Sequence, residues 1–269
     1  MRRTAFLQLC NSLQPHLQRQ TTTFRKPVPV DQCVAICIWR LATNVEFRTI
    51  SHLFGIGQST AVSVTNHVAS AIVKNLLSLF IRTPSEQEFE SIIQGFRDRW
   101  GFPQCGGAID GTHIGILAPP VSSADYYNRK GFYSVILQER FEGVDVPVVI
   151  LEDAAYPLLP WLMKPYPENQ QTTPAQATFN NRLSKARMTV ERAFDLLKGR
   201  WRCLMKRCDC HIDNINTIIS ACCMLHNFCQ VNGEECEEIA AEEENLFLLM
   251  PDFSAIFGLR LIDLELILF

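Results

Sequence analysis

Apolar residues recur at helical spacing through the first hundred residues of the chain. Two sets of positions carry the pattern: Phe6, Leu9, Leu13 and Leu17, then Val34, Ile38 and Leu41. This spacing predicts amphipathic helices, and we expect residues 1–82 to form a helical N-terminal region. Within residues 83–104, Thr83-Pro84-Ser85-Glu86 predicts the start of a connector helix that ends near Gly101.

A helix-turn-helix pattern lies within this region, in the segment EFRTISHLFGIGQSTAVSVTNHVASAI. A short helix is predicted from about Glu46 to Phe54, then a turn at Gly55-Ile56-Gly57, and a second helix that begins near Ser59. The buried stripe of the second helix is predicted at Ala61, Val64, Val68 and Ile72. Its other face carries short polar side chains suited to contact base edges in a DNA major groove: Ser59, Thr60, Ser63, Asn66 and His67. A helical hairpin that never touches DNA gives the same pattern, so both interpretations stay open.

Beyond about residue 105 the pattern changes to short β-like runs, at 108–117, 132–138 and 146–151. The helical pattern returns from about Thr173. This order predicts an α/β domain over residues 105–231, which follows the helical region and the connector. The remaining residues, 232–269, form an acidic segment and an apolar tail, and charged residues interrupt the tail too often for a membrane span.

Charge is distributed unevenly along the 269 residues, although the formal net charge is only −3. Residues 234–244 hold seven Glu and no base, so the rest of the chain is basic. Residues 182–207 hold nine Lys and Arg against Glu191 and Asp195. This density suits binding to a polyanion such as nucleic acid, and a solvated helix face is the plainer alternative.

The eleven cysteines are scattered without a regular framework, and no cleavable secretory signal is visible. A reducing intracellular compartment fits this usage best. Cys203, Cys208, Cys210 and His211 are close together in sequence, but the paired CxxC spacing of a zinc site is missing.

Three acids lie in surroundings that suggest metal chemistry. Asp110 interrupts an apolar run, Asp153 follows the apolar VPVVIL, and Glu191 lies beside the predicted core stripe of a helix. Carboxylates at strand ends can converge on divalent cations for phosphoryl transfer. Each acid has a plainer alternative: a hairpin turn at Asp110-Gly111, a turn cap at Asp153, and a salt bridge from Glu191 to Arg187.

The same residues carry a resemblance. IDGTHI, ADYYNRKGFYSV, DAAYPLLPWLMKPYPENQ, NRLSKARMTVERAF, LLKGRWRCL and LHNFC occur together and in this order. Together with the helix-turn-helix, they make the chain resemble a PIF/Harbinger-type transposase-derived nuclease, over residues 23–229. The resemblance implies an RNase H-like core with a DDE triad, which falls by motif on Asp110, Asp153 and Glu191.

The resemblance also implies a cofactor and roles for these residues. Mg²⁺ or Mn²⁺ would be bound by the triad, with Asp110 bridging two ions, Asp153 holding one and Glu191 the other. Further bases on the same helix are expected to contact DNA phosphates: Arg187, Arg192, Lys198 and Arg200. Family members commonly act with a Myb-like partner protein, and a nuclear location, with cytoplasm as a second compartment, is expected.

The chain departs from the family at three places. Only ERFEGVD separates SVILQ from VPVVIL, where family members have a further strand and a helix. Glu152 replaces the usual glycine before the second acid, and Asp195 replaces a glycine after Glu191. The missing segment would leave a sheet edge and apolar surface uncovered, so we expect truncation of the RNase H-like sheet and impaired cleavage.

The sequence therefore predicts a transposase-derived, metal-dependent endonuclease that hydrolyses DNA phosphodiester bonds, impaired by the segment missing after Gln138. Two alternatives stay open. One is a catalytically inactive module that binds DNA or protein, and the other is the product of an aberrant transcript.

Overall fold

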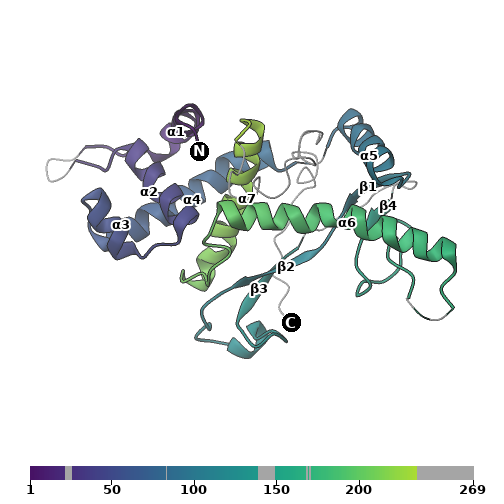
Figure 1. The fold of residues 1–269 in the computed structure, drawn as a ribbon. Coiled ribbons are helices and arrows are strands. Elements are labelled where there is room, and N and C mark those ends of the chain that lie inside the picture. Colours follow the sequence, from purple (N-terminus) through teal and green to yellow (C-terminus); the bar gives the residue numbers. More distant parts are fainter. Residues whose placement is uncertain (22–25, 83, 139–148, 168, 170, 235–269) are drawn as a thin grey trace.

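The computed structural model describes residues 1–21, 26–82, 84–138, 149–167, 169 and 171–234. Five helices come first in the chain: α1 (Arg3–Leu17), α2 (Val30–Thr43), α3 (Phe47–Phe54), α4 (Gln58–Phe80) and α5 (Glu86–Trp100). In Figure 1 the helices α1 to α4 gather at one end of the molecule, and α5 lies at the other end beside β1 and β4. The helical character predicted for residues 4–100 is therefore confirmed.

The turn between α3 and α4 has the predicted geometry. Gly55 ends α3 in the left-handed region, with a φ of 64°, where glycine carries no steric penalty. The helix α4 begins at Gln58, one residue before the predicted start, and buries Ala61, Val64, Val68 and Ile72 as predicted. The apolar stripe thus fixes which side of α4 is free for contacts.

Capping residues explain why α5 begins and ends where it does. Ser85 caps its N-terminus and Glu88 closes a capping box, with the Glu88 carboxylate accepting from the Ser85 backbone N–H at 2.7 Å. Gly101 ends the helix at a φ of 63°. Both limits agree with the predicted connector helix.

The strands form two small sheets. Parallel pairing joins β1 (Cys105–Ala108) to β4 (Val149–Leu151) and β4 to β5 (Leu162–Met163), giving the order β1-β4-β5. Antiparallel pairing joins β2 (Gly111–Gly115) to β3 (Ser134–Gln138). The single strand predicted over 108–117 is thus divided at Ile109-Asp110: its first part pairs with β4, and its second part with β3.

Two long helices follow the sheets: α6 (Pro174–Arg200), capped by Thr173, and α7 (Ile212–Val231). The predicted stripe of α6 is buried throughout, at Leu183, Ala186, Val190, Phe194 and Leu197. The chain is therefore a mixed α/β protein with seven helices in its described part. Figure 1 shows α6 running from the end that holds α5 and β1 towards α7.

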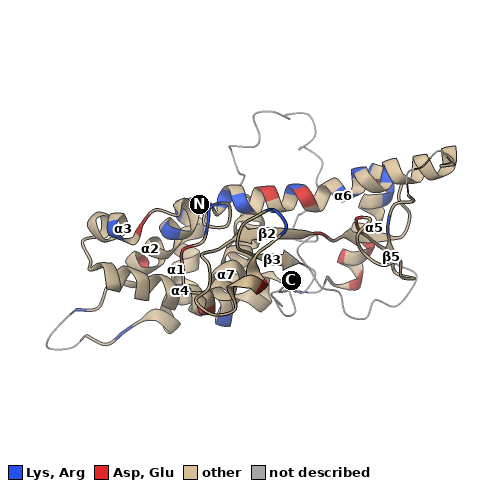
Figure 2. Cartoon of the chain, turned by 90° about the horizontal axis from the view of Figure 1, so that it is seen from below, with Lys and Arg blue, Asp and Glu red and all other residues tan. Residues whose placement is uncertain are grey.

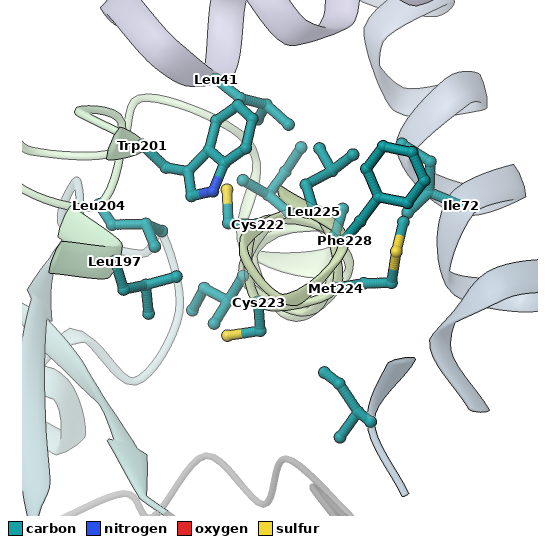
Figure 3. Packing of buried hydrophobic residues seen from close by; sticks show 14 of the residues in the cluster. Leu41, Ile72, Leu197, Trp201, Leu204, Cys222, Cys223, Met224, Leu225 and Phe228 are labelled. Carbon is teal, nitrogen blue, oxygen red and sulfur yellow. The ribbon is translucent and has the colours of Figure 1, made fainter. Parts of the chain in front are cut away.

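The helix α7 links the helical region to the α/β part. It packs against α4, and Figure 3 shows Phe228 and Met224 pointing towards Ile72, with Trp201 and Leu197 on another side of α7. Thirteen of its twenty residues are buried. One continuous core cluster accordingly runs from Ala5 to Cys229. The division into domains at 82 and 105 stays a prediction.

Several sequence predictions fall outside the described residues. They are the junction at 139–145, the first part of the third predicted strand, and the acidic segment and tail beyond Glu234. None of the helices described is long and apolar enough to span a membrane.

Candidate functional site

Two of the three predicted acids lie at the ends of neighbouring parallel strands. Asp110 comes two residues after the end of β1, and Asp153 comes two residues after the end of β4. Because β1 and β4 are paired in parallel, with Ala108 opposite Leu151, both acids emerge at the same edge of the sheet. The hairpin-turn alternative for Asp110 does not describe this strand, since β1 and β2 are not paired with each other.

The helix α6 brings Glu191 to this edge through Arg187. The Arg187 guanidinium donates to Asp110 Oδ2 at 2.9 Å and to Glu191 Oε1 at 3.1 Å. The Arg187 side chain is only 15% exposed, so it is largely withdrawn from water. Asp110 and Glu191 lie 81 positions apart in sequence, and one cation joins them. The predicted salt bridge between Glu191 and Arg187 is therefore present, and Arg187 also pairs with Asp110.

Asp153 also caps the turn after β4, as its plainer alternative predicted. Its Oδ1 accepts a hydrogen bond from the Ala155 backbone N–H at 2.8 Å, which caps the turn after β4. The second carboxylate oxygen is not engaged by that bond. A turn cap and a ligand role are compatible in one side chain.

Glu152 is the feature of this edge that the sequence only hinted at. It is 1% exposed, and its Oε2 has no hydrogen-bond partner in the described structure. The pKa of the Glu152 carboxyl is raised to about 8, chiefly by burial and also by the negative charges of Asp153 and Asp110, while Arg187 acts in the opposite direction. Glycine is the residue expected here from the resemblance, and this chain has a buried carboxyl in its place.

The donor set can be tested for its fit to a divalent cation. Asp110 and Glu191 pair with the Arg187 guanidinium, the charges of Asp153 and Asp110 act on Glu152, and oxygen ligands of this kind suit Mg²⁺ or Mn²⁺. The unpartnered Glu152 oxygen and the excess of negative charge both favour a further cation. In the described part of the chain, however, no three His, Cys, Asp or Glu are close enough to hold a metal. The carboxylate oxygens are therefore of the type that a divalent cation prefers, and the Arg187 guanidinium lies between Asp110 and Glu191.

The four bases predicted to bind phosphates have different partners. Arg200 donates to the backbone carbonyls of His226, at 3.4 Å, and of Glu234, so it links α6 to the last part of α7 and the residues after it. Arg192 is half-buried, and Arg187 pairs with the acids. Lys198 donates to Thr112 Oγ1 at 2.6 Å and to the His113 carbonyl at 3.0 Å, on strand β2. Lys198 thus lies against neutral oxygens. Figure 2 shows basic residues towards both ends of α6, with the acids between them.

The predicted recognition residues of α4 line a concavity. Ser59, Thr60, Ser63 and His67 form one wall of a cavity of about 390 Å³. Arg19 and Lys26, from the connection between α1 and α2, also line it. Asn66 is half-buried beside this group and does not line the cavity. Arg19 and Lys26 supply positive charge beside the first turns of α4, where residues 58–67 hold no Lys or Arg.

The cysteine-rich segment forms thiol contacts instead of a metal cluster. The Sγ atoms of Cys208 and Cys210 are 3.1 Å apart, and those of Cys203 and Cys222 are 3.6 Å apart. The cysteines of the described chain are free thiols, and no metal-binding group was found among these residues.

The fold and the site together define a mixed α/β protein whose carboxylates gather where two parallel strands meet a long basic helix. Residues 136–227 match the family of DDE superfamily endonucleases, and this region includes Asp153 and Glu191. The chain therefore carries a DDE superfamily endonuclease region and is related to the Harbinger transposase-derived nucleases, which confirms the resemblance.

Relatives of the chain agree with this assignment. It is 29% identical to the Arabidopsis thaliana protein named "antagonist of LIKE HETEROCHROMATIN PROTEIN 1", over 78% of this chain and 64% of the relative. It is 28% identical to the Homo sapiens protein named "Putative nuclease HARBI1", over 84% of this chain and 74% of the relative. The chain thus spans less than two thirds of the length of the Arabidopsis relative. No solved structure matches it.

The alignment lengths bear on the predicted missing segment. The alignment with the Arabidopsis protein has 259 positions, but it takes in only 78% of this chain, about 210 residues. Roughly 50 positions of that relative therefore face a gap in this chain.

Proposed function

We propose that this chain is a DDE-type, transposase-derived DNA endonuclease whose carboxylates Asp110, Asp153 and Glu191 bind Mg²⁺ or Mn²⁺. The observation that carries the proposal is the meeting of Asp110 and Glu191 on one guanidinium, at the strand edge that also holds Asp153. Acids so distant in sequence gather in this way where a site needs concentrated negative charge. The family match over residues 136–227 supports the same reaction class.

The strand arrangement supports an RNase H-like origin for the domain. The chain from Cys105 to Gly115 pairs with β4 in parallel at one end and with β3 antiparallel at the other. Counted across both small sheets, the neighbours are β3, the continuous segment of β2 and β1, β4 and β5. An RNase H-like sheet has the same order once its outermost strand, next to the counterpart of β3, is left out. In this proposal the strand that would extend the sheet beyond β3 belongs to the missing segment.

The residues of the site have separate tasks in this proposal. Asp110, Asp153 and Glu191 would hold the divalent cation, which would supply activation of water and stabilisation of the leaving oxygen in phosphodiester hydrolysis. Asp110 and Asp153 are held rigidly by the paired strands, and Glu191 by the buried stripe of α6. Arg187 neutralises Asp110 and Glu191 when no other cation is present. Glu152 stays protonated near neutral pH, which limits the charge repulsion at the site.

The N-terminal region supplies DNA contacts in the proposal. The wall of α4 formed by Ser59, Thr60, Ser63 and His67, with Asn66 beside it, lies next to Arg19 and Lys26. Short polar groups beside cations suit a nucleic-acid backbone and base edges. The proposal includes a nuclear location and a Myb-like partner protein, both of which rest on the family resemblance.

Cleavage is expected to be slow in this form. The guanidinium of Arg187 resists the approach of a cation to Asp110 and Glu191, and the shortened sheet leaves β3 without its outer neighbour. The test is nicking of supercoiled plasmid with Mn²⁺, by the parent chain and by Asp110→Asn. Weak nicking that Asp110→Asn abolishes supports the proposal. Robust nicking that the variant abolishes supports the nuclease but contradicts the impairment.

A second candidate function is a non-catalytic module that binds DNA or chromatin proteins. The specific observation in its favour is the Arg187 bridge, which satisfies two acids of the triad without metal. The printed name of the Arabidopsis relative also describes an action on a chromatin protein. Retained DNA binding by an Asp110→Ala, Asp153→Ala double variant, with no nicking by the parent, would favour this candidate. Sequencing the transcript across the junction after Gln138 tests the aberrant-transcript alternative.

A further inference from the structure

The connection between β2 and β3 carries cations and aromatic rings side by side. Arg129 and Lys130 are both exposed and adjacent in sequence, and Tyr127 and Phe132 flank them. The rings of Tyr127 and Phe132 are 53% and 40% exposed. Exposed aromatic rings next to cations form a surface on which bases can stack while the phosphates contact the charges.

The positive charges of Arg129 and Lys130 act on His113 of strand β2, as the charge of Lys198 does. Lys198 is half-buried against Thr112 and His113, and it has no ion pair among the described residues. Burial lowers the pKa of His113, and the positive charges of Lys130, Lys198 and Arg129 lower it further. The three cations therefore surround one strand, β2, from two elements. Of the nearby acids, Asp195 acts on Lys198, and Asp125 lies exposed in the same connection.

A hydrogen-bond network holds the connection in shape. Asn128 Nδ2 donates to Ser134 Oγ at 2.7 Å, and Ser134 Oγ lies 2.9 Å from His113 Nδ1. Asn128 Oδ1 accepts from the Lys130 backbone N–H at 2.9 Å. Gly131 completes the turn with a φ of 85°, which favours glycine. The cations and rings are thus presented by an ordered loop at the end of a paired hairpin.

We propose that this connection, residues 127–132 together with Lys198, binds a single-stranded segment of DNA. The backbone phosphates would contact Arg129, Lys130 and Lys198, and an unpaired base would stack on Phe132. Stacking on exposed aromatic rings along a cationic surface is how proteins hold unpaired strands, whose bases are free to leave the helix. The connection joins the hairpin at its Gly115–Ser134 end, and Asp110 adjoins the other end at Gly111, so a strand bound by the connection and Lys198 would run along β2 towards the acids. This inference rests on the proposed function, since it takes DNA as the substrate.

The test uses fluorescence anisotropy with the full chain and a labelled DNA strand of about 20 nucleotides, longer than a single-strand site of the usual size, in a series of salt concentrations. We expect Arg129→Gln/Lys130→Gln to weaken binding and to reduce the salt slope by about 1.4, because each phosphate contact to a single strand contributes about 0.7. Phe132→Leu is expected to weaken binding about fivefold at low and at high salt, since stacking does not release counterions. Phe132→Tyr is expected to retain the affinity of the parent.

Matched controls separate this surface from general charge and folding effects. Lys74→Gln/Arg97→Gln removes the same charge from exposed positions of α4 and α5, and Trp39→Leu removes an exposed ring of α2. All controls are expected to bind within twofold of the parent. Circular dichroism on each variant shows whether the fold is kept, and the exposed-site variant Arg129→Gln/Lys130→Gln keeps the test valid if Phe132→Leu is unstable.

The outcomes distinguish this inference from the proposed function. Binding of the strand by the parent with all hairpin variants within twofold of it would overturn the inference and leave the proposed function intact. Binding of the strand through Phe132 without any binding of Mn²⁺ would support the inference and contradict the nuclease. A parent that binds neither strand nor duplex would contradict both.

Discussion

Replacement of Glu152 by glutamine tests the electrostatics of the site without touching the triad. In the folded protein the pKa of Glu152 is raised from 4.5 to about 8, and in the unfolded chain the carboxyl returns to its ordinary value. At pH 5 the ionisation of Glu152 therefore costs little stability. As the pH rises towards 8, the unfolded chain releases a proton that the folded protein retains, so the stability of the parent falls. Above about pH 8 both states are ionised, and the loss is constant.

The size of this effect follows from the pKa. Each unit of difference corresponds to about 1.36 kcal/mol, so the parent loses at most about 4 kcal/mol of stability between pH 5 and pH 8 through this group. A glutamine side chain has nearly the same shape as glutamate and no proton to lose. The free energy of unfolding of Glu152→Gln relative to the parent is therefore expected to rise by a few kcal/mol over this range.

The assay is urea denaturation of parent and variant at several pH values between about 5 and about 8, with matched ionic strength. Other titrating groups, including the cysteines, change both proteins alike and cancel in the difference. A difference that stays constant over this range would refute the buried, protonated Glu152. Glu152→Asp serves as a control, because it keeps an acid in the buried position and should keep the pH dependence.

Two further predictions concern Arg187 and the core. Arg187→Gln is expected to raise the affinity for Mn²⁺ by about tenfold or more, because the cation no longer competes with a guanidinium for Asp110 and Glu191; isothermal titration calorimetry measures this, and an equal or weaker affinity would contradict it. Leu225→Ala is expected to lower the free energy of unfolding by about 2–5 kcal/mol, because Leu225 is fully buried where α7 meets the core; chemical denaturation checks it, and a loss below about 1 kcal/mol would count against the packing of α7.

The helices were predictable because their signals are local. The apolar stripe of α6 can be recognised from residues three and four positions apart. The helices α5 and α6 begin after the caps Ser85 and Thr173, and α5 ends before Gly101. The turn at Gly55 followed in the same way from its position between two periodic segments. Local periodicity and capping therefore account for most of the helical architecture.

The tertiary features were not predictable from the sequence. Periodicity cannot show that α7 packs on α4, or that one strand is divided at Asp110 between two pairing partners, because both depend on contacts distant in sequence. The convergence of Asp110 and Glu191 was expected from the resemblance, but the Arg187 bridge between them was not.

The basic residues show the same limit of sequence reasoning. Arg187 and Arg200 were both expected to bind phosphates. Their surroundings differ, because Arg187 pairs with an acid and Arg200 donates to a backbone carbonyl of α7. Arg129 and Lys130 were overlooked because they lie in a connection, away from the basic helix. A count of charges along the chain therefore does not reveal which cations remain available to a ligand.

The proposed nuclease depends on the gathering of Asp110, Asp153 and Glu191 around a divalent cation. Calorimetric titration of the parent with Mn²⁺, beside the double variant Asp110→Asn/Asp153→Asn, measures this binding, with circular dichroism to show that both proteins are folded. We expect one saturable binding process in the parent and its loss in the double variant. A folded parent that binds no Mn²⁺, or a double variant that binds it equally well, would refute the metal site.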